Sequence, residues 1–331
     1  MKILKNIASE RGHATTEYLT KLSRFIFSVE NHNDDFGYRV KVFNILGFKF
    51  NKLNLPRLKV LDDFYVENKP VYLSIVAIAK NEAPYVKEWI EFHKLVGVER
   101  FYFYDNGSTD NTREVLEPYI KNGTVVYKYC EGQCLQNKVY ADAILKYRNQ
   151  TRWLAIIDLD EFIVPLEKDN IRDFLKYYED FPAVGINWVM FDCNGHKTKP
   201  QTYKGMVTRN YTRALKNTNS KTNCQIKSIV NPQKVVSVFS PHYCIYKNKE
   251  FAVNENKEII YGGFSEKHSS NKIQLNHYYT KSEEEYWIKY NRGSADMLEN
   301  RRVYNNEILN FPESEQNLKI QKYWEKLEKH I

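Results

Sequence analysis

The chain has 331 residues, of which 42% are hydrophobic and 27% are charged, as is ordinary for a globular protein. This length allows one large domain or two modest ones with a substantial core. The formal net charge of +8 fits a phosphate-bearing ligand, an anionic membrane surface or nucleic acid, without choosing among them. No run of about 18 apolar residues occurs, which excludes a conventional transmembrane helix.

The first residues, MKILKNIASERGH, lack the apolar core of a signal peptide, so we expect a protein that faces the cytosol. The five cysteines are scattered and odd in number, which predicts reduced thiols. The aromatic share of 15% suits a protein whose clefts stack sugar or other planar rings, and it suits a well-packed core equally well.

Residues 1–70 carry weak signals. A short helix is expected over 17–27, and the alternating stretch 38–50 (YRVKVFNILGFKF) predicts a hairpin. We interpret this region as an accessory segment that packs on the main fold. The alternative is a basic, aromatic surface that touches the membrane from the inner side.

From residue 71 onward, strands and helices alternate. Apolar runs predict four strands, and Pro84 is placed to begin the first helix. Alternation of this kind is typical of a parallel sheet with right-handed crossovers. The polar loops after these strands should therefore meet at one edge of the sheet. The expected strands are 71–79, 100–104, 124–129 and 153–157, and the expected helices begin at 84, after 110 and at 135.

The fourth strand runs into three carboxylates, Asp158, Asp160 and Glu161, and the chain then turns apolar again. On an extended chain Asp158 and Asp160 point to the same side. Carboxylates that are crowded beside an apolar strand repel one another unless a cation lies between them. This pattern predicts a divalent metal site, and a solvated turn after the strand is the alternative.

Beyond Pro165 we expect a helix over 171–178, several strands and two closing helices over 282–298 and 315–330. No change of composition marks a separate second domain, so the later strands should extend the first sheet. The expected later strands are 184–190, 205–209, 226–230, 235–239 and 243–246. The predicted organisation is an accessory segment over 1–70, a main domain over 71–300 and a helical tail over 301–331.

Several stretches resemble the nucleotide-sugar half of the GT-A glycosyltransferases. The resemblance is closest to glycosyltransferase family 92 and to family-2-like enzymes of bacterial surface polysaccharide synthesis, and it covers residues 71–300. It implies an α/β fold with a Rossmann-type mixed sheet flanked by helices, a β-rich acceptor part and closing helices. The stretches that carry it are AKNEAPYVKEWIEFH, DNGSTDNT, WLAIIDLDEFI, NWVMFDCNGH, IKSIVNP and NHYYTKSEEEYWIKYNRG.

The resemblance assigns roles to residues at the ends of the strands. It implies that Asp105 holds the nucleobase or ribose, with Asn81 and Glu82 nearby. Asp158 and Asp160 would hold Mn²⁺ or Mg²⁺, for which oxygen ligands are suitable. Capping of the loops is the alternative role of the first group, as it is for Ser108 and Asp110.

Further ligands are expected from the C-terminal part. We assign His277 to the metal and Lys281 to the diphosphate, with Arg292 as a further phosphate ligand. His242 is the rival metal ligand, and Lys227 either reaches the phosphates or lies on the surface.

An inverting transfer needs a carboxylate that accepts the proton of the attacking hydroxyl. Asp192 and Glu266 are the candidates, with His196 behind them. Relatives often carry glycine at the position that matches Asp192, which counts against this residue. Trp188 and Phe191 would line the acceptor side together with His196.

The sequence and this resemblance together predict a metal-dependent glycosyltransferase that moves a hexose to a saccharide of the cell surface with inversion. The resemblance implies a UDP-sugar donor, with galactose as the expected sugar, a saccharide or lipid-linked saccharide as acceptor, and no nucleic-acid partner. A sugar nucleotidyltransferase is the alternative within the fold, but AKNEAPY lacks the glycine-rich phosphate loop that such an enzyme needs. A non-catalytic binder of polysaccharide or RNA explains the charge but not the acids at the end of a strand.

Overall fold

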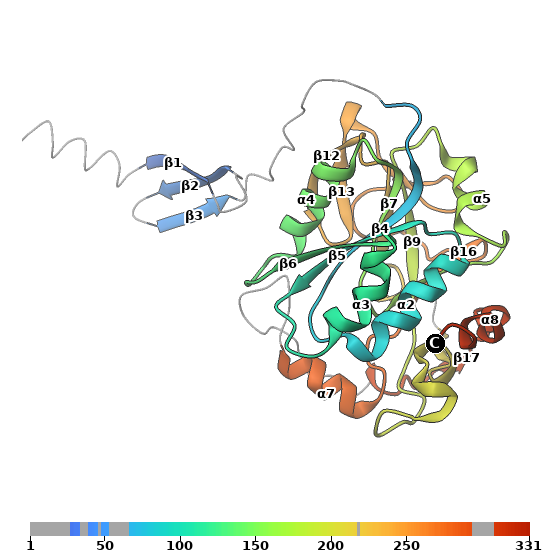
Figure 1. The fold of residues 1–331 in the computed structure, drawn as a ribbon. Helices are drawn as coiled ribbons and strands as arrows, with labels where there is room; N and C mark the ends of the chain where they lie inside the picture. The colour runs from blue at the N-terminus through green and yellow to red at the C-terminus, as the bar shows by residue number, and fades with distance from the viewer. Residues whose placement is uncertain (1–26, 34–38, 46–47, 53–65, 217–218, 293–307) are drawn as a thin grey trace, which may run out of the picture. The chain divides into compact units, whose positions relative to one another are not determined.

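The structure is a computed structural model that describes residues 27–33, 39–45, 48–52, 66–216, 219–292 and 308–331 (Figure 1). Contacts divide the chain into two units, Met1–Lys59 and Val60–Ile331. In the first unit, β1 (Phe27–Asn33), β2 (Arg39–Ile45) and β3 (Phe48–Lys52) form an antiparallel sheet. The predicted hairpin is thereby confirmed, whereas residues 17–26 of the predicted helix lie outside the described residues and Phe27 begins β1.

The second unit is built on a mixed sheet with the strand order β15-β14-β9-β11-β7-β4-β5-β6. The predicted parallel core is confirmed: β4 pairs in parallel with β5 and β7, and β5 pairs in parallel with β6. Nearly every residue of β4 is buried, as expected for a strand covered on both faces. These strands are β4 (Val71–Ala79), β5 (Arg100–Asn106), β6 (Val125–Cys130) and β7 (Thr151–Ile156).

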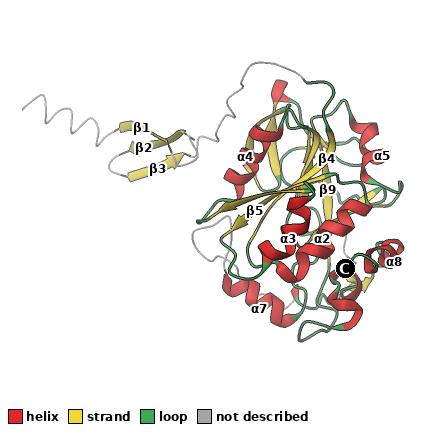
Figure 2. Cartoon of the chain, viewed as in Figure 1, coloured by secondary structure: helices red, strands yellow, loops and turns green. Residues whose placement is uncertain are grey.

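Three helices connect these strands, namely α2 (Ala83–Leu95), α3 (Thr112–Lys121) and α4 (Gln136–Tyr147). Pro84 lies in the first turn of α2, where a missing N–H costs no hydrogen bond. In Figure 2, α2 and α3 lie side by side in front of the sheet, and the two helices contact each other. Trp89 of α2 packs on Phe101 of β5 with ring centroids 5.5 Å apart, which places the core between helices and sheet.

The later strands extend the same sheet, as predicted. β11 (Ile226–Val230) pairs antiparallel with both β7 and β9 (Ala183–Met190), so it joins the two halves. β16 (Ile273–His277) pairs antiparallel with β8 (Glu161–Pro165) and in parallel with β9. β14 (Ala252–Val253) and β15 (Ile259–Ile260) form the outer edge, and β12 (Val235–Ser240) and β13 (Tyr243–Tyr246) form a separate hairpin. The predicted mixed sheet flanked by helices is confirmed.

The predicted strand over 205–209 is wrong. This segment contains the end of the 3-10 helix η2 (Thr202–Gly205) and the start of α6 (Val207–Asn210). The buried carboxylate of Glu88 on α2 accepts hydrogen bonds from the N–H groups of Val207 and Thr208, at 2.6 and 3.0 Å. An acceptor from a distant helix thus caps the first turn, and no local pattern could have shown it.

The closing helices are confirmed in part. α7 (Glu283–Arg292) begins as predicted, and residues 293–298 of the predicted helix lie outside the described residues. The last predicted helix begins too early, because Ser314–Gln316 forms β17, which pairs with β10 (Arg213–Leu215). Only η5 (Gln321–Tyr323) and α8 (Trp324–Glu328) are helical there. The predicted helix over 171–178 is confirmed as α5 (Ile171–Leu175) and η1 (Lys176–Tyr178), and η3 (Lys247–Lys249) follows β13.

Among the described residues, no helix is long and apolar enough to cross a bilayer.

Candidate functional site

Side-chain hydrogen bonds join the loops that follow β4 and β5. Asn81 lies at the end of β4 with a φ of 57°, and its N–H donates to Ser108 Oγ at 2.9 Å. Its side-chain oxygen accepts from the N–H of Thr109 at 2.7 Å. The N–H of Ala83 donates to Asp110 Oδ2 at 3.1 Å, so the second loop also caps the start of α2.

Asp105 stabilises the loop that follows β5. Its carboxylate accepts from the N–H of Ser108 at 2.8 Å and from the hydroxyl of Tyr127 at 2.7 Å. Asp105 is buried, and Gly107 supplies the left-handed φ of 71° that the turn requires. The position at the end of β5 agrees with the prediction, and the carboxylate already orders the loop in this structure.

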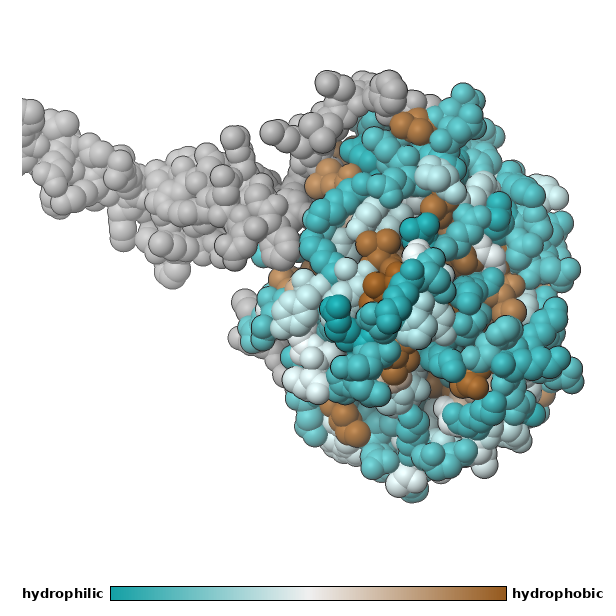
Figure 3. Space-filling view, viewed as in Figure 1, coloured by the Kyte–Doolittle hydropathy of each residue, from teal (hydrophilic) through white to brown (hydrophobic). Residues whose placement is uncertain are grey.

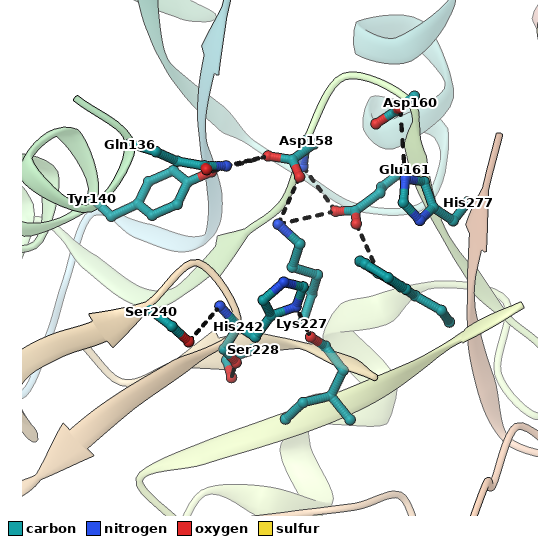
Figure 4. Close-up of polar contacts among 12 residues, drawn as sticks. Gln136, Tyr140, Asp158, Asp160, Glu161, Lys227, Ser228, Ser240, His242 and His277 are labelled. Carbon is teal, nitrogen blue, oxygen red and sulfur yellow. Dashed lines mark hydrogen bonds and ion pairs between the residues drawn. The ribbon is translucent and has the colours of Figure 1, made fainter. Parts of the chain in front are cut away.

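Asp158, Asp160 and Glu161 form an acidic loop after β7 (Figure 4). Because β7 pairs in parallel with β4, and β4 with β5, this loop lies at the same sheet edge as the loops after β4 and β5. Residues 159 and 160 form a turn, so the alternation expected for an extended chain does not apply. Asp158 accepts from Gln136 Nε2 and the hydroxyl of Tyr140 on α4, each at 3.0 Å. Asp160 faces β16 and α7 instead. The two aspartates therefore have different partners.

Two lysines supply positive charge to the acidic loop. Lys227 on β11 is buried, and its Nζ lies 2.8 Å from Asp158 Oδ2 and 3.7 Å from Glu161 Oε2. Burial acts to lower the pKa of Lys227, but the carboxylates of Asp158 and Glu161 outweigh it and hold the pKa above its usual value. Lys289 on α7 pairs with Asp160. The crowded carboxylates need a neighbouring positive charge, and the ammonium groups of Lys227 and Lys289 supply it in this structure.

The ammonium group of Lys289 also favours the ionised form of Asp160. Burial acts to raise the pKa of Asp160, but the Lys289 ammonium and the His277 imidazole outweigh it, so the pKa lies well below its usual range. Sequence reasoning did not single out Lys289. The available signal was its spacing, because it lies three residues before Arg292 and so shares one face of α7.

Glu161 anchors the acidic loop. Its side chain is fully buried, and it accepts from the N–H of Asp158 at 2.8 Å and from Trp188 Nε1 at 2.7 Å. Burial raises the pKa of this carboxyl to about 8 despite the opposing charge of Lys227. Both oxygens are used within the protein, so Glu161 holds the loop in place.

Two histidines flank the indole of Trp188. His277 Nε2 lies 3.6 Å from Asp160 Oδ2, and its Nδ1 is buried without a hydrogen-bond partner among the described residues. Nδ1 of His242 contacts the carbonyl of Ile226 at 2.8 Å, and burial lowers the pKa of His242 to about 4. Burial also lowers the pKa of His277 although the Asp160 carboxylate opposes this shift, so both imidazoles favour the neutral form, and of the two only His277 lies beside an acid of the loop.

A divalent ion fits part of this donor set. Asp160 Oδ2 and His277 Nε2 offer an oxygen and a nitrogen 3.6 Å apart, while Nδ1, the other ring nitrogen of His277, is buried and lacks a partner within the described ranges. Asp158 is turned toward Lys227 instead. In the described part of the chain, no three histidine, cysteine or acidic side chains are grouped as a metal site.

The two cations that were predicted to bind phosphate contact other groups. Arg292 donates to Glu82 Oε1 at 3.0 Å and to the carbonyl of Lys80, so α7 is tied to the loop after β4. Lys281 is buried with a φ of 52°, and its Nζ lies 4.1 Å from the ring centroid of Tyr85. Arg292 thus lies at the sheet edge beside Glu82, which was predicted to lie near the nucleoside of the sugar donor. Lys281 lies against Tyr85 of α2.

Comparison with known proteins identifies the family of the chain. The sequence model of glycosyltransferase family 92 matches residues 69–330, most of the chain. The chain belongs to glycosyltransferase family 92. The resemblance seen in the sequence is thereby confirmed.

Relatives of this family 92 chain match it over limited regions. A family 92 protein of Oryza sativa subsp. japonica is 28% identical over 141 residues, which are 42% of this chain and 24% of the relative. Galactan beta-1,4-galactosyltransferase GALS2 of Arabidopsis thaliana is 28% identical over 154 residues, which are 43% of this chain and 28% of that protein. The matches thus span about a quarter of the length of these relatives.

Among solved structures, the S. aureus protein TarS (residues 1–349) in complex with UDP-GlcNAc is similar to the family 92 chain. The similarity covers 49% of this chain and 45% of TarS, with a TM-score of 0.32 and 15% identity.

The two candidate bases of the family 92 domain lie in different surroundings. Asp192 is buried after β9, where it accepts from the N–H of Asn194 at 2.9 Å and lies 4.0 Å from Arg213 Nε. Glu266 is exposed. Nε2 of His196 contacts the carbonyl of Asn210 at 3.1 Å. None of the described contacts joins these residues to the acidic loop, so their catalytic role stays a prediction.

Proposed function

We propose that this family 92 protein is a metal-dependent glycosyltransferase that moves a hexose from a UDP-sugar to a saccharide of the cell surface, with inversion. The observation that carries this is the acidic loop, which lies beside the polar loops of β4 and β5 at one sheet edge with Lys227 and Lys289 against it. Carboxylates and fixed cations together form a site that can hold a bound cation and an anionic leaving group.

We propose galactose as the transferred sugar. The support is the similarity to galactan beta-1,4-galactosyltransferases GALS2 and GALS3, which are 28% and 29% identical over the matched regions. The acceptor would then be a saccharide or lipid-linked saccharide that presents a free hydroxyl group.

Asp158, Asp160 and His277 are the residues that would hold Mn²⁺ or Mg²⁺. Such an ion, when bound, neutralises the charge that develops on a departing diphosphate. Arg292 and Lys281 would act on the same charge, and Lys289 already lies at Asp160. The nucleoside would lie against Asp105, Asn81 and Glu82, which order the loops after β4 and β5.

The proton of the attacking hydroxyl needs an acceptor within hydrogen-bond reach. Asp192 and Glu266 are both kept as proposals. The buried Asp192 follows β9, whose last residue pairs with His277. Glu266 is open to solvent, where an acceptor can reach it.

The test is calorimetric binding of UDP with Mn²⁺ and with a chelator, combined with UDP release from a panel of UDP-sugars. We expect Mn²⁺ to strengthen UDP binding, and Asp160→Ala to weaken binding in Mn²⁺ by about tenfold or more. Asp169→Ala, which removes a fully exposed carboxylate, is the matched control and should change nothing. Equal UDP affinity with chelator and with Mn²⁺, together with no effect of Asp160→Ala, would refute the proposal.

A further inference from the structure

A pocket with aromatic walls lies beside the candidate site. Its volume is about 580 Å³, within the range of small-molecule binding sites. Phe239 and Tyr243, from the β12–β13 hairpin, have ring centroids 6.1 Å apart, and Phe251 and Tyr261 on the following segment have centroids 5.0 Å apart. We call this the aromatic pocket, and its main lining residues are Phe239, His242, Tyr243, Phe251, Tyr261 and Phe264.

The rings of the aromatic pocket are unusually open to solvent. Tyr261 is 70% exposed, Phe264 is 58% exposed and Phe239 is 56% exposed. Of the ten large hydrophobic residues that are exposed in the described ranges, four line this pocket. On the side of the molecule seen in Figure 3, hydrophobic residues are scattered in small groups among hydrophilic ones. A gathering of exposed rings marks a surface that binds something.

His242 joins the aromatic pocket to the acidic loop. It lines the pocket, and its ring centroid is 5.1 Å from that of Trp188, whose indole N–H donates to Glu161. Figure 4 shows His242 beside Lys227, the counterion of Asp158. The absence of a side chain at Gly263 permits this packing, because a Cβ there would lie 3.1 Å from the Cβ of His242.

We propose that the aromatic pocket is the acceptor subsite, which binds a pyranose ring of the saccharide by stacking; this rests on the proposed function. The carbon-bound hydrogens of a pyranose form an apolar face that packs on an aromatic ring, while its hydroxyl groups point outward in the plane of the sugar. Tyr243 and Tyr261 carry hydroxyl groups that can bind such sugar hydroxyls. A sugar held here lies against His242, on the side that leads to Lys227 and the acidic loop.

The test separates acceptor binding from donor chemistry. Tyr261→Ala and Phe264→Ala remove exposed rings, so the fold should be unaffected, and Tyr177→Ala removes a ring of 59% exposure elsewhere as a control. The probes are β-1,4-galactotetraose, cellotetraose, maltotetraose and chitotetraose. The readouts are saturation-transfer NMR of each saccharide with the protein, the saccharide-dependent release of UDP from UDP-galactose, and UDP affinity without saccharide.

We expect at least one saccharide to bind, and Tyr261→Ala and Phe264→Ala each to raise its KM by about tenfold while Tyr177→Ala leaves it unchanged. Tyr261→Phe, which keeps the ring, should retain most of the binding. UDP affinity without saccharide should be the same in all variants. If the proposed donor site itself were wrong, the wild-type protein would fail to bind UDP, and this outcome differs from a failure of the acceptor subsite. Binding of the saccharide that persists in both alanine variants, or no binding of any saccharide to the wild-type protein, would overturn the acceptor subsite.

Discussion

The replacement of Lys227 by methionine tests the electrostatics of the acidic loop. Methionine keeps the apolar length of the side chain and removes the ammonium, which lies 2.8 Å from Asp158 Oδ2 and 3.7 Å from Glu161 Oε2. At an effective dielectric constant of about 20, the 2.8 Å separation from Asp158 corresponds to an attraction of about 6 kcal/mol, and Glu161 adds little near neutral pH because its pKa is about 8. Because desolvation of the buried ammonium offsets several kcal/mol, we expect a net loss of about 3–5 kcal/mol in the free energy of unfolding.

The assay is urea denaturation of Lys227→Met beside Lys234→Met, which removes an ammonium of 27% exposure that lies 3.2 Å from Glu250. The control should lose about 1 kcal/mol or less, since partly exposed ion pairs contribute little. Mn²⁺ should recover part of the loss in Lys227→Met, because a cation returns to carboxylates that have lost their partner. Equal stability of the two variants would refute the assignment of Lys227 as the main counterion.

Two further predictions follow from other contacts. Burial lowers the pKa of His93 to about 3, and its ring contacts the Trp89 carbonyl and accepts from the N–H of Ile163, so it is neutral when folded. Since the unfolded histidine has a pKa of about 6.5, stability should be lost as pH falls below this value, by about 2 kcal/mol at about pH 5 relative to about pH 8. Urea denaturation of His93→Asn at both pH values should show this part of the pH dependence removed, and an unchanged pH dependence would contradict it. Arg292→Ala should change the free energy of unfolding by about 1 kcal/mol or less but weaken UDP binding about tenfold, measured by calorimetry; a loss of stability without a loss of affinity would make Arg292 purely structural.

The sequence was sufficient to predict the parallel half of the fold. Strands such as Val71–Ala79 are buried on both faces, and this burial appears in the sequence as an uninterrupted apolar run. The segment over Val207–Asn210 could not be predicted, because the carboxylate that caps it belongs to Glu88, 119 and 120 residues earlier. The pairing of Ser314–Gln316 with β10 is of the same kind, since a distant strand decides it.

The acidic loop was predictable for the same reason, because it directly follows a buried strand. Its counterions were not. Lys227 lies in the short apolar stretch IKSIVNP, where a lysine reads equally well as a surface residue, and only the pairing of β11 with β7 places it at Asp158. Lys289 depends on where α7 packs. The sequence shows which polar residues directly follow the buried strands. The charged residues that neutralise these acids lie on other strands and helices, and only the fold brings those elements to the site.

The two lysines that neutralise the acidic loop differ in burial and in the acids that they contact. Lys227 sits on a central strand, and its side chain is 1% exposed, so its charge belongs to the core of the fold. Lys289 sits on α7, its side chain is 16% exposed, and its partner Asp160 is also the acid nearest His277. On the proposed function, a cation or a phosphate that enters at Asp160 would meet Lys289 first, while Lys227 holds Asp158 and Glu161 in place. Loss of Lys227 should accordingly act on stability, and changes on α7 should act on ligand binding.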